Sequence, residues 1–185
     1  MLVYDLSEDG GSFKAEYKET RKIPYQSSNG QGWGLAHGRG ENGEELLYAT
    51  DGSSKLYVVD PETWAQTREV TVKTSAGREV ARLNEIEMLP AEGEQHYLLA
   101  NVWGADAIHL IDVRTGTIKR TWSLPELQQN QRDYIAKTGE RNYDFGNAVL
   151  NGIAYYPPND SFLIAGKLWD HIYEVKLDYR DAIQD

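Results

Sequence analysis

Short apolar runs that end in a polar residue recur along the chain. They occupy residues 2–5, 56–60, 108–112 and 172–176, at intervals of about 50 to 65 residues. Apolar runs of this length between turn residues are typical of β-strands rather than of helices. The first three runs are each followed by a polar turn segment. The pattern therefore predicts a repeated strand–turn unit.

Further strands are predicted on both sides of these runs. A strand and a tight turn precede each of the last three, at residues 45–50, 97–102 and 161–165, and residues 66–73 and 117–124 form a strand after two of them. A repeat of ~40–50 residues with three or four antiparallel strands is typical of a β-propeller blade. A β-sandwich also has many short strands, but it has no reason to repeat one strand–turn–strand unit. We therefore predict an all-β fold built as a β-propeller.

The length of the chain predicts an incomplete ring. At this repeat, 185 residues hold about three to four blades, whereas closed propellers have four to eight. We predict a single partial propeller domain over residues 1–185, with a polar insertion between blades at residues 126–147. Because an open ring leaves a sheet edge unpaired, we expect a segment outside this chain or a partner to close it.

Polar and aromatic residues gather beside glycines or tight bends at the ends of the predicted strands. Such positions lie at the rim of a sheet, so residues from successive blades are expected to form one pocket. Five clusters have this form: Gly32-Trp33-Gly34-Leu35, Leu83-Asn84-Glu85-Ile86-Glu87, Ala100-Asn101-Val102-Trp103, Leu150-Asn151-Gly152-Ile153-Ala154 and Gly166-Lys167-Leu168-Trp169.

Three tryptophans, one asparagine and one lysine in these clusters are the candidate binding residues. Trp33, Trp103 and Trp169 lie beside or near glycines. Three indoles can line an apolar pocket with an N–H each, although packing between blades is the alternative for each of them. Asn84 can hydrogen-bond an amide as donor and acceptor, or it can satisfy local backbone groups. Lys167 follows an apolar strand and reaches either the pocket mouth or open solvent.

Alternation along residues 83–87 predicts which side chains share a face. On a strand, Asn84 and Ile86 point to one side, and Glu85 and Glu87 point to the other. We therefore expect the candidate amide of Asn84 to lie beside Ile86 and away from both carboxylates.

Composition and charge argue against several classes of function. The formal net charge is −10, and an acidic surface repels phosphate, which argues against nucleic acid and anionic membranes as partners. The chain has no cysteine, and its four histidines lack metal-ligand spacing, so we predict no metal site and no thiol chemistry. No apolar run approaches the ~18 residues of a membrane span, and residues 1–6 are not expected to be a signal peptide.

The order of the clusters resembles the plant and bacterial type of glutaminyl-peptide cyclotransferase, or glutamine cyclotransferase, a five-bladed β-propeller family. The resemblance also rests on Thr50-Asp51-Gly52 and Asp60-Pro61-Glu62-Thr63, and it runs from about residue 2 to about residue 177. It implies that the N-terminal glutamine of a peptide is cyclised to pyroglutamate with release of ammonia, without a metal or other cofactor. By the same resemblance, the substrate-binding residues are Trp33, Asn84, Trp103, Lys167 and Trp169.

One part of the family pattern does not occur in the chain. The resemblance implies an acid/base glutamate in an F-G-E-G motif upstream of the clusters, and Glu85 and Glu87 belong to a different motif. We therefore expect no catalytic residue, and weak or no activity, in this chain alone. A non-catalytic propeller remnant that binds a peptide or a protein is the alternative. The family is commonly secreted or periplasmic, but these residues leave the compartment open.

Overall fold

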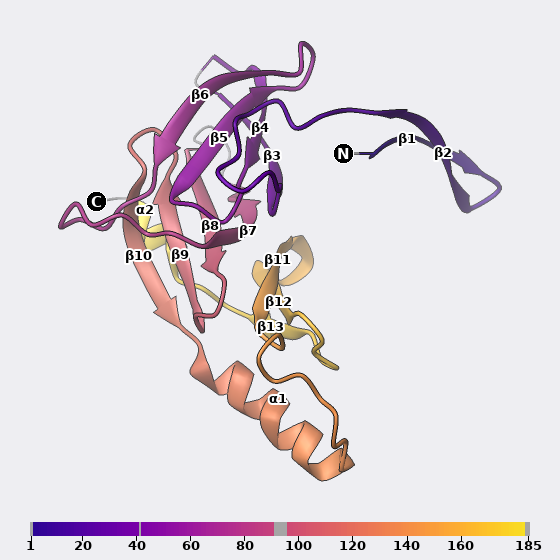
Figure 1. Ribbon diagram of the computed structural model, residues 1–185, viewed down its shortest axis with the longest axis vertical. Coiled ribbons are helices and arrows are strands. Elements are labelled where there is room, and N and C mark those ends of the chain that lie inside the picture. The colour runs from indigo at the N-terminus through magenta and orange to yellow at the C-terminus, as the bar shows by residue number, and fades with distance from the viewer. Residues whose placement is uncertain (1, 41, 91–95, 184–185) are drawn as a thin grey trace.

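The structure is a computed structural model that describes residues 2–40, 42–90 and 96–183 (Figure 1). Its strands form three antiparallel sheets and a separate hairpin. The hairpin pairs β1 (Leu2–Asp9) with β2 (Ser12–Thr20) and extends away from the sheets in Figure 1. Several of its apolar side chains, among them Leu6 and Phe13, are exposed. The hairpin therefore contributes little to the apolar layers between the sheets.

Two four-stranded sheets follow the order of the chain, each strand pairing antiparallel with the next. The first sheet consists of β3 (Leu35–Arg39), β4 (Glu45–Ala49), β5 (Lys55–Asp60) and β6 (Ala65–Thr71). The second sheet consists of β7 (Leu83–Met88), β8 (Tyr97–Val102), β9 (Ala107–Asp112) and β10 (Thr117–Ser123).

The third sheet is joined to the second by a helix. α1 (Pro125–Thr138) begins with proline, which suits the first turn because its missing N–H would have no partner there. α1 occupies most of the predicted polar insertion, and the strand pattern did not predict it. The sheet itself and the remaining elements are β11 (Leu150–Tyr156), η1 (Pro157–Asn159), β12 (Ser161–Gly166), β13 (Tyr173–Val175) and α2 (Tyr179–Ile183). Neither α1 nor any other described helix is long and apolar enough to cross a membrane.

Apolar layers hold the three sheets together face to face. The layer between the first and second sheets includes Tyr48, Ile86 and Leu98. The layer between the second and third sheets includes Leu99 and Phe162. Neighbouring residues of β8 thus point into opposite layers, as the pleat of a strand requires. Because the second sheet is covered on both faces, its strands read as continuous apolar runs.

The predicted all-β, partial propeller fold is confirmed. Each sheet has its first strand on the inside, and the inner strands β3, β7 and β11 lie next to one another (Figure 1). The strands predicted from the repeat correspond to β1, β4 to β6, β8 to β10, β12 and β13, with small differences at their ends. Within the described ranges, the sheets do not close into a ring.

A bulge in β7 contradicts one sequence prediction. The pairing of β7 with β8 shifts between Leu83 and Ile86, and an extra residue at such a bulge interrupts the alternation of faces. Ile86 packs into the layer with the first sheet, whereas the Asn84 side chain reaches Asn151 of β11 in the third sheet. Asn84 and Ile86 therefore lie on opposite sides, and the prediction that they share a face was wrong.

Candidate functional site

The five sequence clusters lie at one edge of the three sheets. Antiparallel neighbours run in opposite directions, so the start of each inner strand lies beside the end of the next strand. The pairs at this edge are Leu35 with Ala49, Leu83 with Val102, and Leu150 with Gly166. The segments before β3, β7 and β11 and those after β4, β8 and β12 therefore share this edge, called the cluster edge below.

A buried threonine ties the first sheet to the second at the cluster edge. Thr50 follows β4 and is fully buried. Its hydroxyl donates to the Asn84 carbonyl at 2.6 Å and accepts from the Gly34 N–H at 2.8 Å. One side chain thus joins the segment before β3 to the start of β7, and it satisfies two buried backbone groups.

A buried asparagine makes the equivalent link between the second and third sheets. Asn101 in β8 is fully buried. Its Nδ2 donates to the Leu150 carbonyl at 2.6 Å, and its Oδ1 accepts from the Glu85 N–H at 2.8 Å. Gly166 occupies the corresponding place at the end of β12 and has no side chain to make such a link. The two links therefore hold β3, β7 and β11 in a fixed relation.

The candidate amide of Asn84 lies between the second and third sheets. The residue is 8% exposed. Its Nδ2 donates to the Oδ1 of Asn151, a half-buried residue of β11. This hydrogen bond orients the Asn84 amide and leaves its Oδ1 as an acceptor. Sequence reasoning identified Asn84 but gave it no partner.

The indole of Trp33 rests against a glycine. The backbone N–H of Trp33 donates to the Thr50 carbonyl at 2.9 Å. The indole Nε1 of Trp33 donates to Gln31 Oε1 at 2.8 Å. Gly52 has a φ of 82°, and a Cβ built on it would lie 2.7 Å from the Trp33 ring. A larger residue would be strained and would displace the indole. Gly52 therefore sets where Trp33 lies.

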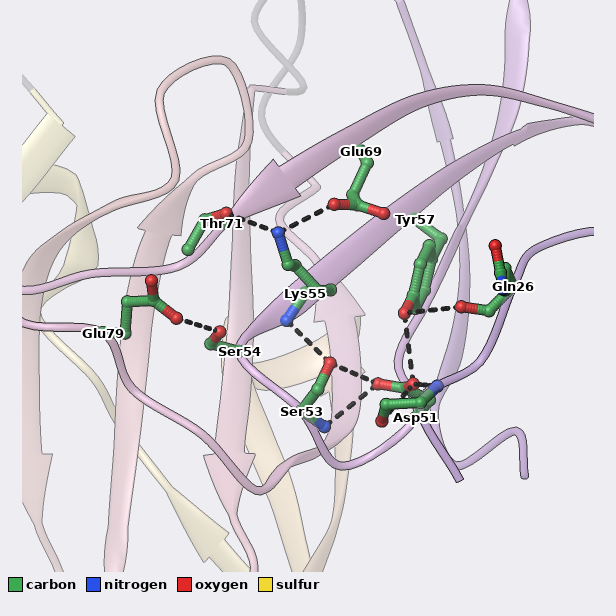
Figure 2. Close-up of polar contacts among 10 residues, drawn as sticks. Gln26, Asp51, Ser53, Ser54, Lys55, Tyr57, Glu69, Thr71 and Glu79 are labelled. Carbon is green, nitrogen blue, oxygen red and sulfur yellow. Dashed lines mark hydrogen bonds and ion pairs between the residues drawn. The ribbon is translucent and has the colours of Figure 1, made fainter. Parts of the chain in front are cut away.

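A buried carboxylate organises the loop in front of β3. Asp51 is fully buried, and it accepts hydrogen bonds from the Ser53 hydroxyl at 2.5 Å and the Tyr57 hydroxyl at 3.1 Å (Figure 2). The Ser28 N–H donates to it at 2.7 Å, and Asn29 Nδ2 donates to its carbonyl oxygen at 2.8 Å. Burial would raise the pKa of the Asp51 carboxyl, but the hydrogen bonds from Ser53 and Ser28 outweigh it and hold the pKa at about 2.

Arg82 links Gly52, the glycine against which Trp33 rests, to Trp103. Its backbone is in the left-handed region, with a φ of 64°. The Arg82 N–H donates to the Gly52 carbonyl and the Trp103 N–H donates to the Arg82 carbonyl, both at 2.8 Å. The guanidinium lies over the Trp103 ring, 5.6 Å from its centroid. The structure thus brings Trp33 and Trp103 to neighbouring positions of the cluster edge. Sequence reasoning missed Arg82 because no motif distinguished it.

Lys167 and Trp169 follow β12 but differ in their surroundings. The Lys167 side chain is exposed, and its backbone N–H donates to the Val149 carbonyl at 2.8 Å. The Trp169 indole packs against the layer between the second and third sheets, and its Nε1 donates to the Ala148 carbonyl at 3.3 Å. The structure therefore gives Trp169 a packing role, while the Lys167 side chain is exposed at the cluster edge.

Two glutamates belong to the same strand as Asn84, and the pKa of each carboxyl is shifted. Burial, and then the negative charge of Glu87, raise the pKa of the Glu85 carboxyl to about 7. Burial also raises the pKa of Glu87, although the Tyr155 N–H donates to it at 2.9 Å. A carboxyl with a pKa near 7 can give and take protons at neutral pH. Glu85 is therefore a candidate acid or base, which its sequence motif did not reveal.

Two cavities in the described part of the chain differ in their relation to the predicted residues. A cavity of about 300 Å³ lies on the free face of the first sheet, and of the five predicted residues it is lined by Trp33 alone. A larger cavity of about 650 Å³ lies at the opposite edge, beside Glu45 at the start of β4 and Asp60 at the end of β5. No group of three or more histidine, cysteine or acidic residues in the described part of the chain is placed to hold a metal ion. The cluster edge thus brings together half-buried indoles, buried amides and the exposed side chains of Arg82 and Lys167.

Comparisons with known proteins agree with one another. The sequence profile of the glutamine cyclotransferase family matches residues 8–177. Glutaminyl-peptide cyclotransferase of Arabidopsis thaliana is 34% identical over 171 residues, which are 92% of this chain and 48% of that protein. The crystal structure of Myxococcus xanthus glutaminyl cyclase superimposes with a TM-score of 0.72 and 29% identity, over 96% of this chain and 64% of that one. The chain thus spans about half to two thirds of the length of these relatives.

Proposed function

The chain belongs to the glutamine cyclotransferase family, and we propose that its cluster edge is the part of a glutaminyl cyclase that binds the N-terminal glutamine of a peptide. The observation that carries this proposal is the placement of Trp33, Trp103 and Asn84 by a shared set of hydrogen bonds through Gly52, Arg82 and Thr50.

The chemistry of glutamine fits the groups at the cluster edge. Its side chain has a short apolar stem and an amide. Indole faces cover an apolar stem well, which suits Trp33 and Trp103. The free Oδ1 of Asn84 can accept a hydrogen bond from the amide nitrogen of the substrate, because its own Nδ2 is held by Asn151. Lys167 adds an exposed cation at the same edge.

Cyclisation needs one further group. The α-amine of the glutamine attacks the side-chain amide carbon, a new carbon–nitrogen bond forms, and the amide nitrogen leaves as ammonia once it is protonated. A group that takes a proton from the amine and gives one to the leaving nitrogen suits this step. The acid/base glutamate that the family resemblance implies is not among these 185 residues. We therefore propose binding, with weak or no turnover, as the function of this chain alone.

Binding of short peptides to the 185-residue chain tests the proposal. Isothermal titration would compare Gln-Ala-amide with Asn-Ala-amide, whose side chain is one methylene shorter. We expect the glutamine peptide to bind about three- to tenfold more tightly, because burial of one methylene contributes about 0.8 kcal/mol. Trp103→Ala should remove most of this binding.

A tryptophan outside the cluster edge provides the matched control. Trp122 lies in the outer strand β10, under a stacked Arg120 and with its indole N–H on Asp178. Trp122→Ala should leave the glutamine peptide's affinity unchanged. Equal affinity for the two peptides, or equal losses from the two tryptophan variants, would contradict a glutamine site at the cluster edge.

A further inference from the structure

Arg82 is held in a strained conformation that fixes the direction of its side chain. Its φ of 64° lies in the left-handed region, which is unfavourable for a residue with a long side chain. Hydrogen bonds to Gly52 on one side and Trp103 on the other keep it there. Strain of this kind persists only where the surroundings impose it, and it is concentrated at ligand sites.

Among the arginines that lie over aromatic rings, Arg82 differs from Arg120 and Arg180, whereas Arg132, over Phe145, also makes no ion pair with a described carboxylate. Arg120 lies over Trp122 and pairs with Asp178, and Arg180 lies over Tyr179 and pairs with Asp160. Arg82 lies over Trp103, but none of the carboxylates in residues 2–40, 42–90 and 96–183 is within ion-pair distance of it.

This lack of an acidic partner is notable in so acidic a chain. The sequence has 29 aspartates and glutamates against 19 lysines and arginines. The Arg82 side chain is exposed, and its guanidinium carbon lies 5.6 Å from the centroid of the Trp103 ring, so its N–H donors can reach a ligand that lies against this ring. A guanidinium matches a carboxylate, which can accept two parallel hydrogen bonds from it.

We propose that Arg82 binds a carboxylate carried by the second residue of the peptide substrate. This inference rests on the proposed function, because it requires the first residue, glutamine, to lie against Trp103. The second residue then leaves the site past the ring on which Arg82 is stacked. The carboxylate comes either from the free C-terminus of a dipeptide or from an acidic side chain at the second position. Arg82 is thus a residue that determines specificity and takes no part in the proton transfers.

Four glutamine peptides test whether a carboxylate is bound and which part of the peptide carries it. Gln-Ala carries a terminal carboxylate, and Gln-Ala-amide is its neutral counterpart. Gln-Glu-amide carries a side-chain carboxylate, and Gln-Gln-amide is its neutral counterpart of the same size. For the wild-type chain we expect one or both acidic peptides to bind about three- to tenfold more tightly than the neutral counterpart, as for a partly exposed ion pair. The preference should shrink between 0.05 and about 0.5 M salt, because salt screens exposed charges.

The variant Arg82→Gln tests the assignment. It removes the charge and keeps a polar side chain, so the ratio of affinities for acidic and neutral peptides should fall to near one. Arg82→Lys, which keeps a charge but not the planar fork, should retain part of the ratio. Arg120→Gln is the matched control, since Arg120 is also stacked on a tryptophan but lies on the outer strand β10. It should leave the ratio unchanged. Thermal unfolding of each variant would show that it is folded.

The outcomes distinguish this inference from the function on which it rests. If all four peptides bind the wild-type chain with equal affinity, Arg82 has no such role, while the glutamine site stands. A preference that survives Arg82→Gln would assign the carboxylate to another cation and overturn the inference. If no glutamine peptide binds, the proposed function fails, and the inference fails with it. A preference for only one acidic peptide would support the inference and identify the source of the carboxylate.

Discussion

At the scale of single residues, Glu85 shows how the cluster edge alters an ordinary carboxyl. The pKa of Glu85 is raised to about 7 by burial and by Glu87, against about 4.5 when the chain is unfolded. The folded state therefore binds the proton more tightly than the unfolded state. Stability falls as pH rises from about 4.5 to about 7, and above this range the full penalty of the buried charge is present. Protonation of Glu85 thus stabilises the fold.

Glu85→Gln should remove this pH dependence. One pKa unit corresponds to about 1.4 kcal/mol, and partial exposure reduces the penalty, so we expect the variant to gain about 1–2 kcal/mol in free energy of unfolding at pH 8. At pH 4.5 the gain should be close to zero. Urea denaturation at both pH values measures it. The exposed Glu16 of β2 provides the control, and Glu16→Gln should change neither value. An equal gain from Glu85→Gln at the two pH values would contradict the assigned pKa.

At the scale of elements, the buried link from Asn101 couples the second sheet to the third. Its amide satisfies the Glu85 N–H and the Leu150 carbonyl at once. Asn101→Ala would leave both buried groups without a partner, and each such group costs about 1–3 kcal/mol. We expect the variant to lose about 2–4 kcal/mol in free energy of unfolding, measured by urea denaturation.

An exposed asparagine provides the control for this loss in free energy of unfolding. Asn159 also hydrogen-bonds through its Nδ2, to Glu174, but it lies at the surface in η1. Asn159→Ala should change the free energy of unfolding by less than about 0.5 kcal/mol. A loss below about 1 kcal/mol for Asn101→Ala would mean that the sheets are held together by their apolar layers alone.

Most strands were predictable from the sequence for two reasons. The strands of the second sheet are covered on both faces and so form continuous apolar runs, and the same strand–turn unit recurs along the chain. The bulge in β7 was not predictable, because the one extra residue between Leu83 and Ile86 leaves no mark in the sequence pattern. Helix α1 was missed because its polar composition, with few apolar residues, resembles a loop. In the candidate site, Trp33 and Trp103 stood out through their glycine neighbours, and these two residues and Asn84 stood out through the family resemblance. Arg82 did not, because its role depends on contacts with residues far away in sequence.

At the scale of the whole molecule, the proposed binding surface lies in a chain without the acid/base glutamate that the family resemblance implies. Two inter-sheet links, Thr50 and Asn101, hold the proposed binding groups, although the sheets do not close into a ring within the described ranges. The hydrogen bonds that make these two links are all formed between described residues. Binding and turnover should therefore be separable in experiments on the 185-residue chain.

Ammonia release measures this separation directly. Incubated with Gln-Ala-amide, the 185-residue chain should bind the peptide yet release ammonia at less than about tenfold the uncatalysed rate, because well-placed acid–base groups contribute about 10²–10⁴-fold and the family's glutamate is not in this sequence. A glutamate dehydrogenase assay for ammonia gives the rate. Release far above this level would contradict the expectation and would make Glu85, with its pKa of about 7, the first residue to test. In that case Glu85→Gln should abolish the excess, while Glu16→Gln should preserve it, which would place the acid and base within this chain.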